Sequence, residues 1–297
     1  DGECIIGNVP HLNDVTTTLD LLGRMGVEIS VDERLNVAIN TQNIKNYRAP
    51  YELVRTMRAS ILVLGPLLAH YGEAEVSLPG GCAIGSRPVD LHIEGLREMG
   101  AEISVENGYI KAKAKRLKGA HLVLDLVTVT GTENLLMAAV LAEGTTTIYN
   151  AACEPYLQQL CKMLNRMGAK ISGIGSNMLS IEGVEALGGT EHTMLPDMIE
   201  IGSWIGLAAM TKSELTIKNV SWNDLGQIPS VFKKLGIQLE KRGDDIYIPP
   251  HVDGYEIQNY IDGSILTIAD APWPGFTPDL LSIVLVIATQ ARGEVVI

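Results

Sequence analysis

Hydrophobic and polar positions follow a unit that recurs four times along this chain. In each unit, apolar residues recur at helical spacing, a glycine ends the helix, and two short alternating strands follow. The units begin at residues 19, 91, 157 and 225, and their expected helix-capping glycines are Gly26, Gly100, Gly168 and Gly236. These glycines lie 74, 68 and 68 residues apart, so the pattern predicts a fold built from βαβαββ-like repeats.

A second apolar helix is predicted between consecutive units, at residues 49–72, 130–144, 196–212 and 277–293. Three of the four begin at a proline, Pro50, Pro196 or Pro278, which suits the first helical turn because no backbone donor is needed there. The helices are apolar nearly all round, so we expect them to be buried beneath the sheets.

A glycine-rich stretch, 185–197, ends in a proline and an aspartate and indicates a domain boundary near Leu195. We therefore expect a first repeat domain at 1–195, with an incomplete N-terminal unit, and a second at 196–297, truncated at its C-terminal end. Because the pattern starts and stops partway through a unit, we expect the chain to be a piece of a longer protein.

Composition narrows the class of protein. The net charge of −12 disfavours non-specific nucleic-acid binding. The N-terminus lacks the basic and apolar regions of a signal peptide, and no apolar run is long enough for a membrane span. The four cysteines show neither CxxC pairing nor a histidine at metal-ligand spacing, so we expect a cytoplasmic protein with no metal, disulfide or cofactor. The oligomeric state stays open.

One segment, GGCAIGSRPVDLH at 80–92, carries a thiol and a fixed positive charge in a glycine-rich loop. Glycines permit a sharp bend that would expose Cys82, and Arg87 could hold an anion near the thiol. A free cysteine is more often a small buried filler, but the glycines favour a loop over a packed element.

This segment, the repeat, the stretch RLKGAHLVLDLVTVTGTENLLMAAVLAEGTT and the FTPD motif closely resemble the UDP-N-acetylglucosamine enolpyruvyl transferases, over essentially the whole chain. The resemblance implies an α/β (α+β) fold of the enolpyruvyl transferase type, an inside-out α/β barrel with two domains and an active site in the cleft between them. It implies transfer of enolpyruvate from phosphoenolpyruvate to the C3 hydroxyl of UDP-N-acetylglucosamine, with release of phosphate. That is the first committed step of peptidoglycan synthesis.

The resemblance also implies roles for particular residues. Cys82 protonates the methylene carbon of phosphoenolpyruvate and is the site of fosfomycin alkylation. Arg87 faces phosphoenolpyruvate, the segment after it holds the uridine nucleotide, and Asp279 accepts the proton of the C3 hydroxyl. The implied catalytic residues are Cys82, Asp279 and Arg87, and the implied substrate-binding residues are Arg58, Arg87, Pro88, Val89, Asp90, Leu91, Thr128, Val129 and Asp279.

Several of these residues have simpler explanations. Arg58 lies in a predicted apolar helix, where it either contacts a ligand or reaches the surface. Asp279 and Asp197 occupy matching positions at two predicted helix starts, so a favourable interaction with the helix dipole explains both. Residues 124–134 are expected to form a strand, a turn and a helix start with Thr132 as its cap, and the backbone amides of such a start can hold a phosphate.

The chain also departs from the family. Leu126 stands where members often have a nucleotide-binding lysine, and the family's Lys-Asn pair and two later arginines have no counterpart. Two alternatives stay open. One is a 5-enolpyruvylshikimate-3-phosphate synthase-like transferase, which shares the fold and the donor, although the cysteine segment and RPVDLH disfavour it. The other, motivated by the missing basic residues, is a non-catalytic sugar-nucleotide-binding relative.

Overall fold

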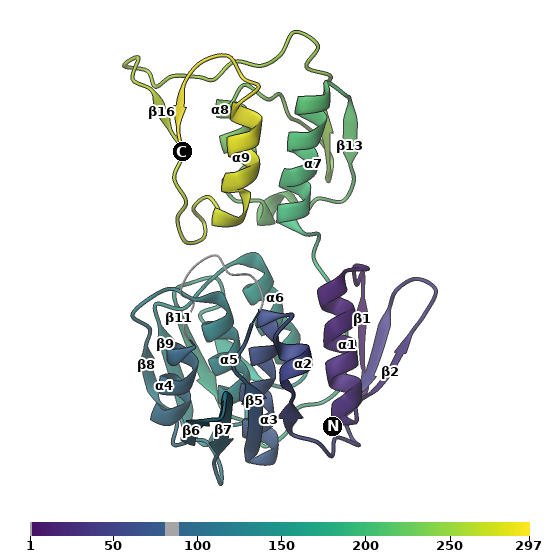
Figure 1. Ribbon diagram of the computed structural model, residues 1–297, viewed down its shortest axis with the longest axis vertical. Coiled ribbons are helices and arrows are strands. Elements are labelled where there is room, and N and C mark those ends of the chain that lie inside the picture. The colour runs from purple at the N-terminus through teal and green to yellow at the C-terminus, as the bar shows by residue number, and fades with distance from the viewer. Residues whose placement is uncertain (1, 81–88) are drawn as a thin grey trace. The chain divides into compact units, whose positions relative to one another are not determined.

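The computed structural model describes residues 2–80 and 89–297 (Figure 1). It divides into two compact units, Asp1–Met194 and Leu195–Ile297. No helix in the described part of the chain combines the length and apolar character needed to cross a bilayer.

The first unit contains three four-stranded sheets with one common topology, β12-β1-β3-β2, β4-β5-β7-β6 and β8-β9-β11-β10. In each sheet the first two strands are parallel and the remaining neighbours are antiparallel. The predicted repeat is therefore present at the level of strand pairing. The strands are β1 Cys4–Gly7, β2 Glu28–Val31, β3 Val37–Asn40, β4 Arg48–Ala49, β5 Glu73–Ser77, β6 Glu102–Glu106, β7 Tyr109–Lys113, β8 His121–Val123, β9 Thr145–Tyr149, β10 Lys170–Ser172, β11 Met178–Glu182 and β12 Thr190–Thr193.

One helix of each repeat ends as the sequence predicts. These helices are α1 Asn13–Met25, α4 Asp90–Glu98 and α6 Pro155–Arg166. The glycines after them, Gly26, Gly100 and Gly168, have φ of 101°, 92° and 106°. This left-handed conformation is easily reached only by glycine, which explains the residue at each helix end.

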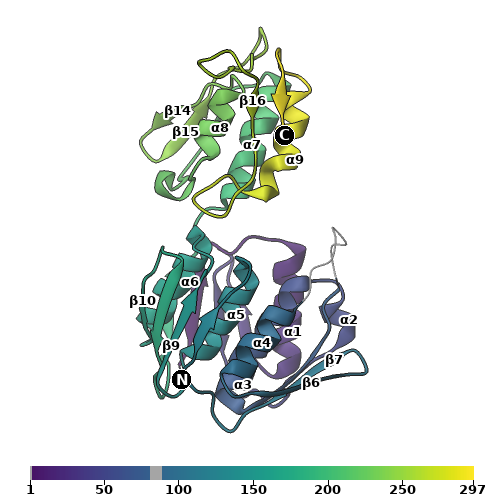
Figure 2. The same ribbon diagram turned by 90° about the vertical axis from the view of Figure 1, so that its left-hand side faces the viewer.

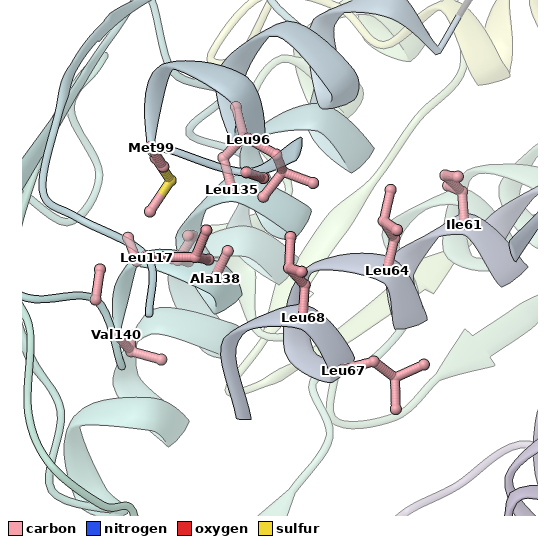
Figure 3. Close-up of a cluster of buried hydrophobic side chains, with 14 of the residues drawn as sticks. Ile61, Leu64, Leu67, Leu68, Leu96, Met99, Leu117, Leu135, Ala138 and Val140 are labelled. Atoms are coloured by element: carbon pink, nitrogen blue, oxygen red, sulfur yellow. The ribbon is translucent and has the colours of Figure 1, made fainter. Parts of the chain in front are cut away.

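Two further helices, α3 Leu64–Tyr71 and α5 Val129–Ala139, are apolar and form the centre of the unit. Figure 2 shows α5 and α4 between the sheet that contains β9 and the sheet that contains β6 and β7. Leucines of α3, α4 and α5 pack together there with Met99 (Figure 3). Glycines permit the close approach: a Cβ at Gly65 would lie 2.4 Å from the Asn134 carbonyl oxygen, and one at Gly95 would lie 2.5 Å from Leu135 Cδ2.

The helix predicted at 49–72 is wrong as a single element. The segment forms a short α2, Tyr51–Val54, a 3₁₀ helix η1, Arg58–Val63, and then α3. Met57 lies between α2 and η1 with φ −140° and ψ 112°, which places its side chain in the interior at 4% exposure. Packing of this residue overrides the helical spacing of the sequence.

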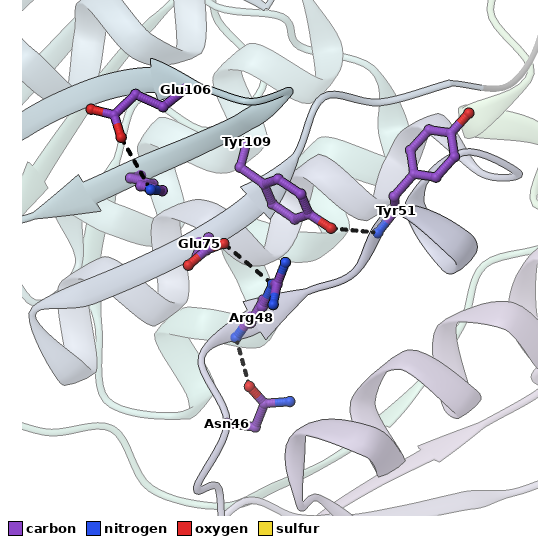
Figure 4. Close-up of polar contacts among 7 residues, drawn as sticks. Asn46, Arg48, Tyr51, Glu75, Glu106 and Tyr109 are labelled. Atoms are coloured by element: carbon purple, nitrogen blue, oxygen red, sulfur yellow. Dashed lines mark hydrogen bonds and ion pairs between the residues drawn. The ribbon is translucent and has the colours of Figure 1, made fainter.

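Polar contacts fix the start of this broken segment against β5 and β7 (Figure 4). Tyr109 Oη accepts a hydrogen bond from Tyr51 N at 3.2 Å. Arg48 pairs with Glu75 at 3.2 Å, and its guanidinium lies over the Tyr109 ring at 4.6 Å. Asn46 Oδ1 accepts from Arg48 N at 3.1 Å. The chain that leads to η1 is therefore anchored before it enters the core.

The second unit follows the same principles with fewer strands. Its elements are α7 Met198–Thr211, β13 Leu215–Ile217, η2 Trp222–Asp224, α8 Ile228–Lys234, β14 Glu240–Arg242, β15 Asp245–Ile248, β16 Leu266–Thr267, η3 Pro278–Leu280, α9 Leu281–Ala288 and β17 Val295–Val296. The strands form a sheet in the order β13-β15-β14 and a parallel pair, β16-β17. Gly236, after α8, has φ of 88°.

Helices α7 and α9 lie side by side, and Gly206 permits contact with Ile287 (Figure 1). Contrary to expectation, they are not buried all round. Trp204 and Leu207 of α7 are 45% and 49% exposed, and Leu285 of α9 is 55% exposed. One face of each helix packs into the core of the second unit. The opposite face is not covered by any element in the part of the chain that the structure describes.

Candidate functional site

Three segments predicted to contact substrate meet through one buried polar network in the first unit. Arg58 begins η1, Asp90 and Leu91 begin α4, and Val129 begins α5 after Thr128. The side chain of Asn134, on α5, connects all three segments.

Asn134 has no exposed surface and uses both ends of its amide. Its Oδ1 accepts a hydrogen bond from Gly65 N at 2.7 Å. Its Nδ2 donates to the Ile61 carbonyl oxygen at 3.1 Å and lies 3.0 Å from His92 Nδ1. One side chain of α5 therefore holds η1, the start of α3 and the first turn of α4.

His92 is 3% exposed, and burial, with a further contribution from the charge of Arg58, lowers its pKa to about 4. The imidazole is therefore neutral at physiological pH. Because Asn134 Nδ2 is a donor, His92 Nδ1 acts as the acceptor and the proton lies on Nε2.

The start of α5 is capped by Thr128, and the expectation of a Thr132 cap is wrong. Thr128 Oγ1 accepts from Gly131 N at 3.3 Å, from an extended backbone that suits a capping residue. Thr132 lies one turn inside the helix, fully buried. Its hydroxyl donates to Thr128 O at 2.6 Å and accepts from Ala152 N at 3.1 Å. The first backbone amides of α5 have no acceptor within the helix, as phosphate binding requires.

Residues 81–88, which precede α4, lie outside the part of the chain that the structure describes. Cys82, Arg87 and Pro88 are among these residues. Gly80 precedes them, and a Cβ there would lie 2.4 Å from the Arg55 carbonyl oxygen. Close approach to that backbone explains why a glycine stands at this position. At the start of α4, Val89 is buried and Asp90 is exposed.

Leu126 occupies the strand-to-helix turn before Thr128 and is 68% exposed. At this exposure the leucine side chain contributes little to packing, so packing does not require an apolar residue here. A lysine would fit the same position without any change of packing.

In the second unit, Asp279 and Asp197 differ despite their matching sequence positions. Asp197 is the N-cap of α7, and its Oδ1 accepts from Ile199 N at 2.8 Å and Glu200 N at 3.3 Å. Asp279 is exposed, and the cap of η3 is Thr277, whose Oγ1 accepts from Asp279 N at 3.4 Å. The Asp279 carboxylate is therefore not required for capping.

The first unit also contains a mostly apolar cavity of about 640 Å³, lined by α1, α3, α5 and α6. Glu133, in its wall, has a pKa raised to about 7, first by burial and then by the nearby charge of Glu154. An anionic sugar nucleotide needs cations and donors, so this cavity has the wrong chemistry for it. Of the predicted substrate-binding residues that the structure describes, none lines it.

The three cysteines that the structure describes differ in burial, and a raised pKa makes two of them, Cys153 and Cys161, weaker nucleophiles than an exposed thiol. Cys161 is buried, which raises its pKa to about 12. Burial and then Glu154 raise the pKa of Cys153, and Cys4 is half-buried in β1. Over residues 2–80 and 89–297, no three His, Cys, Asp or Glu side chains are grouped to hold a metal ion.

His92 and Asn134 were assigned no role from the sequence, although both lie in the segments that carry the resemblance. The sequence does contain a signal for both residues. A histidine directly after RPVDL and an asparagine in an apolar helix are polar residues at positions expected to be buried, and buried polar residues need hydrogen-bond partners.

Comparison with known proteins first defines the fold. The enolpyruvyl transferase NikO from Streptomyces tendae matches 98% of this chain and 68% of its own, with a TM-score of 0.82 and 18% sequence identity. An EPSP synthase from Acinetobacter baumannii matches 100% of this chain and 67% of its own, with a TM-score of 0.69 and 20% identity. The expected enolpyruvyl transferase fold is therefore confirmed.

Sequence comparison then defines the family. The model of the EPSP synthase (3-phosphoshikimate 1-carboxyvinyltransferase) family matches residues 1–296, and the chain belongs to this family. Within the family, the chain is similar over nearly its whole length to proteins named UDP-N-acetylglucosamine 1-carboxyvinyltransferase. The protein from Bacteroides thetaiotaomicron is 54% identical over 99% of this chain and 69% of its own length. That from Porphyromonas gingivalis is 52% identical over 100% and 70%. The resemblance drawn from the sequence is confirmed.

Proposed function

We propose that the protein carrying this chain transfers the enolpyruvyl group of phosphoenolpyruvate to the C3 hydroxyl of UDP-N-acetylglucosamine, with release of phosphate. The observation that carries the proposal is 48–54% identity over almost the entire chain to proteins named for this reaction. The reaction would supply peptidoglycan synthesis. A cytoplasmic location stays a prediction.

The proposed chemistry needs an acid and a base. Cys82 protonates the methylene carbon of phosphoenolpyruvate, the C3 oxygen attacks the adjacent carbon, and Asp279 accepts the hydroxyl proton. Loss of phosphate and of one methyl proton then restores the carbon–carbon double bond. The exposed carboxylate of Asp279, with Thr277 as the cap in its place, supports its role as a base.

Binding is assigned to the first unit. Arg58 and Arg87 would hold the anionic groups of phosphoenolpyruvate, while the segment Pro88–Leu91 and residues Thr128 and Val129 would hold the nucleotide. The first backbone amides of α5, at Val129 and Thr130, have no acceptor within the helix, which supports a phosphate contact. His92, whose pKa is lowered to about 4, is neutral and adds no positive charge of its own, so the cationic groups of this site are the arginines.

Release of phosphate from phosphoenolpyruvate tests the proposal and its alternatives. The protein is assayed with UDP-N-acetylglucosamine, with shikimate 3-phosphate, and with no acceptor. We expect release only with the sugar nucleotide. Release with shikimate 3-phosphate would favour the reaction named by the family model. Binding of the sugar nucleotide without release would favour a non-catalytic relative.

A further inference from the structure

The buried network of His92 and Asn134 joins the elements that carry the proposed binding residues. Ile61, which receives an Asn134 hydrogen bond, is in the same 3₁₀ helix as Arg58. His92 follows Leu91 in the first turn of α4. Asn134 lies in the α5 helix that Thr128 caps. A displacement of either network residue would therefore move a segment proposed to contact substrate.

We propose that His92 and Asn134 are positioning residues, which hold Arg58, the start of α4 and the start of α5 in one geometry for the two substrates. This inference rests on the proposed function. Neither residue is assigned a contact with substrate.

The donors and acceptors of the network admit one arrangement. Gly65 N can only donate, so it fixes the Asn134 oxygen on its side. The amide nitrogen then faces two acceptors, the Ile61 carbonyl and His92 Nδ1. A network in which each buried group has one permitted role stabilises a single conformation, and one wrong group disturbs several bonds.

The geometry also explains why close substitutes would fail. A Cβ at Gly65 would lie 2.4 Å from Asn134 Oδ1, so the space around the amide is tight. Aspartate at 134 would lose the donor for both acceptors, and leucine would leave the Gly65 amide and Ile61 carbonyl without their present partner. At position 92, glutamine can still accept through its side-chain oxygen, whereas leucine cannot.

The test compares His92→Leu with His92→Gln by steady-state kinetics and thermal unfolding. We expect His92→Leu to raise KM for UDP-N-acetylglucosamine or phosphoenolpyruvate by roughly tenfold, as loss of an oriented contact does. His92→Gln should recover most of that loss, although both variants lower the melting temperature. The dissociation constant of UDP-N-acetylglucosamine, measured by calorimetry, should likewise rise in His92→Leu and recover in His92→Gln. That result would show that substrate binding, and not turnover alone, is affected.

His251→Leu is the matched control. His251 is 6% exposed in the second unit, and its Nε2 accepts from Gln238 N at 2.9 Å, so its loss should lower stability without a change in KM. Equal KM values for unaltered protein and folded His92→Leu would overturn the positioning role, as would equal losses in the Leu and Gln variants of His92.

Asn134→Asp gives an independent measurement. In the unaltered protein, ¹⁵N spectra of the imidazole should show a protonated Nε2 and an unprotonated Nδ1 at pH 7. With a carboxylate at 134, His92 should become protonated on both nitrogens, and KM should rise as for His92→Leu. An Nδ1-protonated ring in the unaltered protein would contradict the network. Failure of the unaltered protein to release phosphate with UDP-N-acetylglucosamine would instead overturn the proposed function, and this inference with it.

Discussion

Glu133→Gln should make the stability of this protein less sensitive to alkaline pH. Glu133 lies on α5 in the wall of the apolar cavity. Burial and the like charge of Glu154 raise its pKa from 4.5 to about 7. Between these two values the folded protein retains a proton that the unfolded chain has lost. The free energy of unfolding therefore falls as the pH rises through this window, and above pH 7 the full cost of ionising the buried carboxyl remains.

The size of the effect follows from the pKa difference. A shift from 4.5 to about 7 corresponds to roughly 3 kcal/mol at about 1.4 kcal/mol per unit. Glutamine cannot ionise, so its variant avoids this cost. The gain in unfolding free energy of Glu133→Gln over the unaltered protein should grow by about 2–3 kcal/mol between pH 5 and pH 8.

Urea unfolding at intervals from pH 5 to pH 8 measures this difference directly. A difference is needed because burial lowers the pKa of His92, His192 and His251. Because these histidines are neutral in the folded protein, its free energy of unfolding falls as the pH drops below their pKa in the unfolded chain. This slope is opposite to that of Glu133 and is the same in the unaltered protein and in Glu133→Gln. Glu98→Gln, on the exposed side of α4, removes a charge without burial and should show no such growth. A gain for Glu133→Gln that is independent of pH would refute the reasoning.

Three further predictions concern the proposed reaction. Asp279→Asn should lower turnover roughly 100-fold, as loss of a general base does. Asp197→Asn should lower the melting temperature and leave turnover nearly intact. Kinetics and calorimetry of both variants measure this, and equal small losses of turnover would show that Asp279 is not the base. Fosfomycin should modify Cys82 alone, because burial protects Cys161; peptide mass spectrometry that finds the adduct on another cysteine would contradict this. Leu126→Lys should tighten binding of UDP-N-acetylglucosamine several-fold at low salt and less at high salt, measured by calorimetry, and an unchanged dissociation constant would show that the exposed position does not face the diphosphate.

The repeat could be predicted because its signals are local. Helical spacing followed by a glycine identifies a helix and its end within a dozen residues, and the glycines at 26, 100, 168 and 236 all have positive φ. The break around Met57 could not be predicted, since it depends on burial of one side chain in a core assembled from distant helices.

The positioning network is similarly non-local. Asn134 pairs with His92 across 42 residues and with Gly65 across 69, so no short motif contains the contact. The sequence identifies the segments that resemble a known site, but the side chains that hold those segments together become visible only when the helices are packed.

The two aspartates show how a small sequence difference acquires meaning from structure. Both follow a proline at a helix start, in MLPDMI and FTPDLL. Before Pro196 stands Leu195, which has no side-chain acceptor, and Asp197 itself caps α7. Before Pro278 stands Thr277, whose hydroxyl caps η3. A threonine in place of a leucine therefore frees the Asp279 carboxylate from a structural role. Capping hydrogen bonds account for Asp197, whereas Asp279 is not the cap of its helix, and its exposed carboxylate is available for the proposed proton transfer.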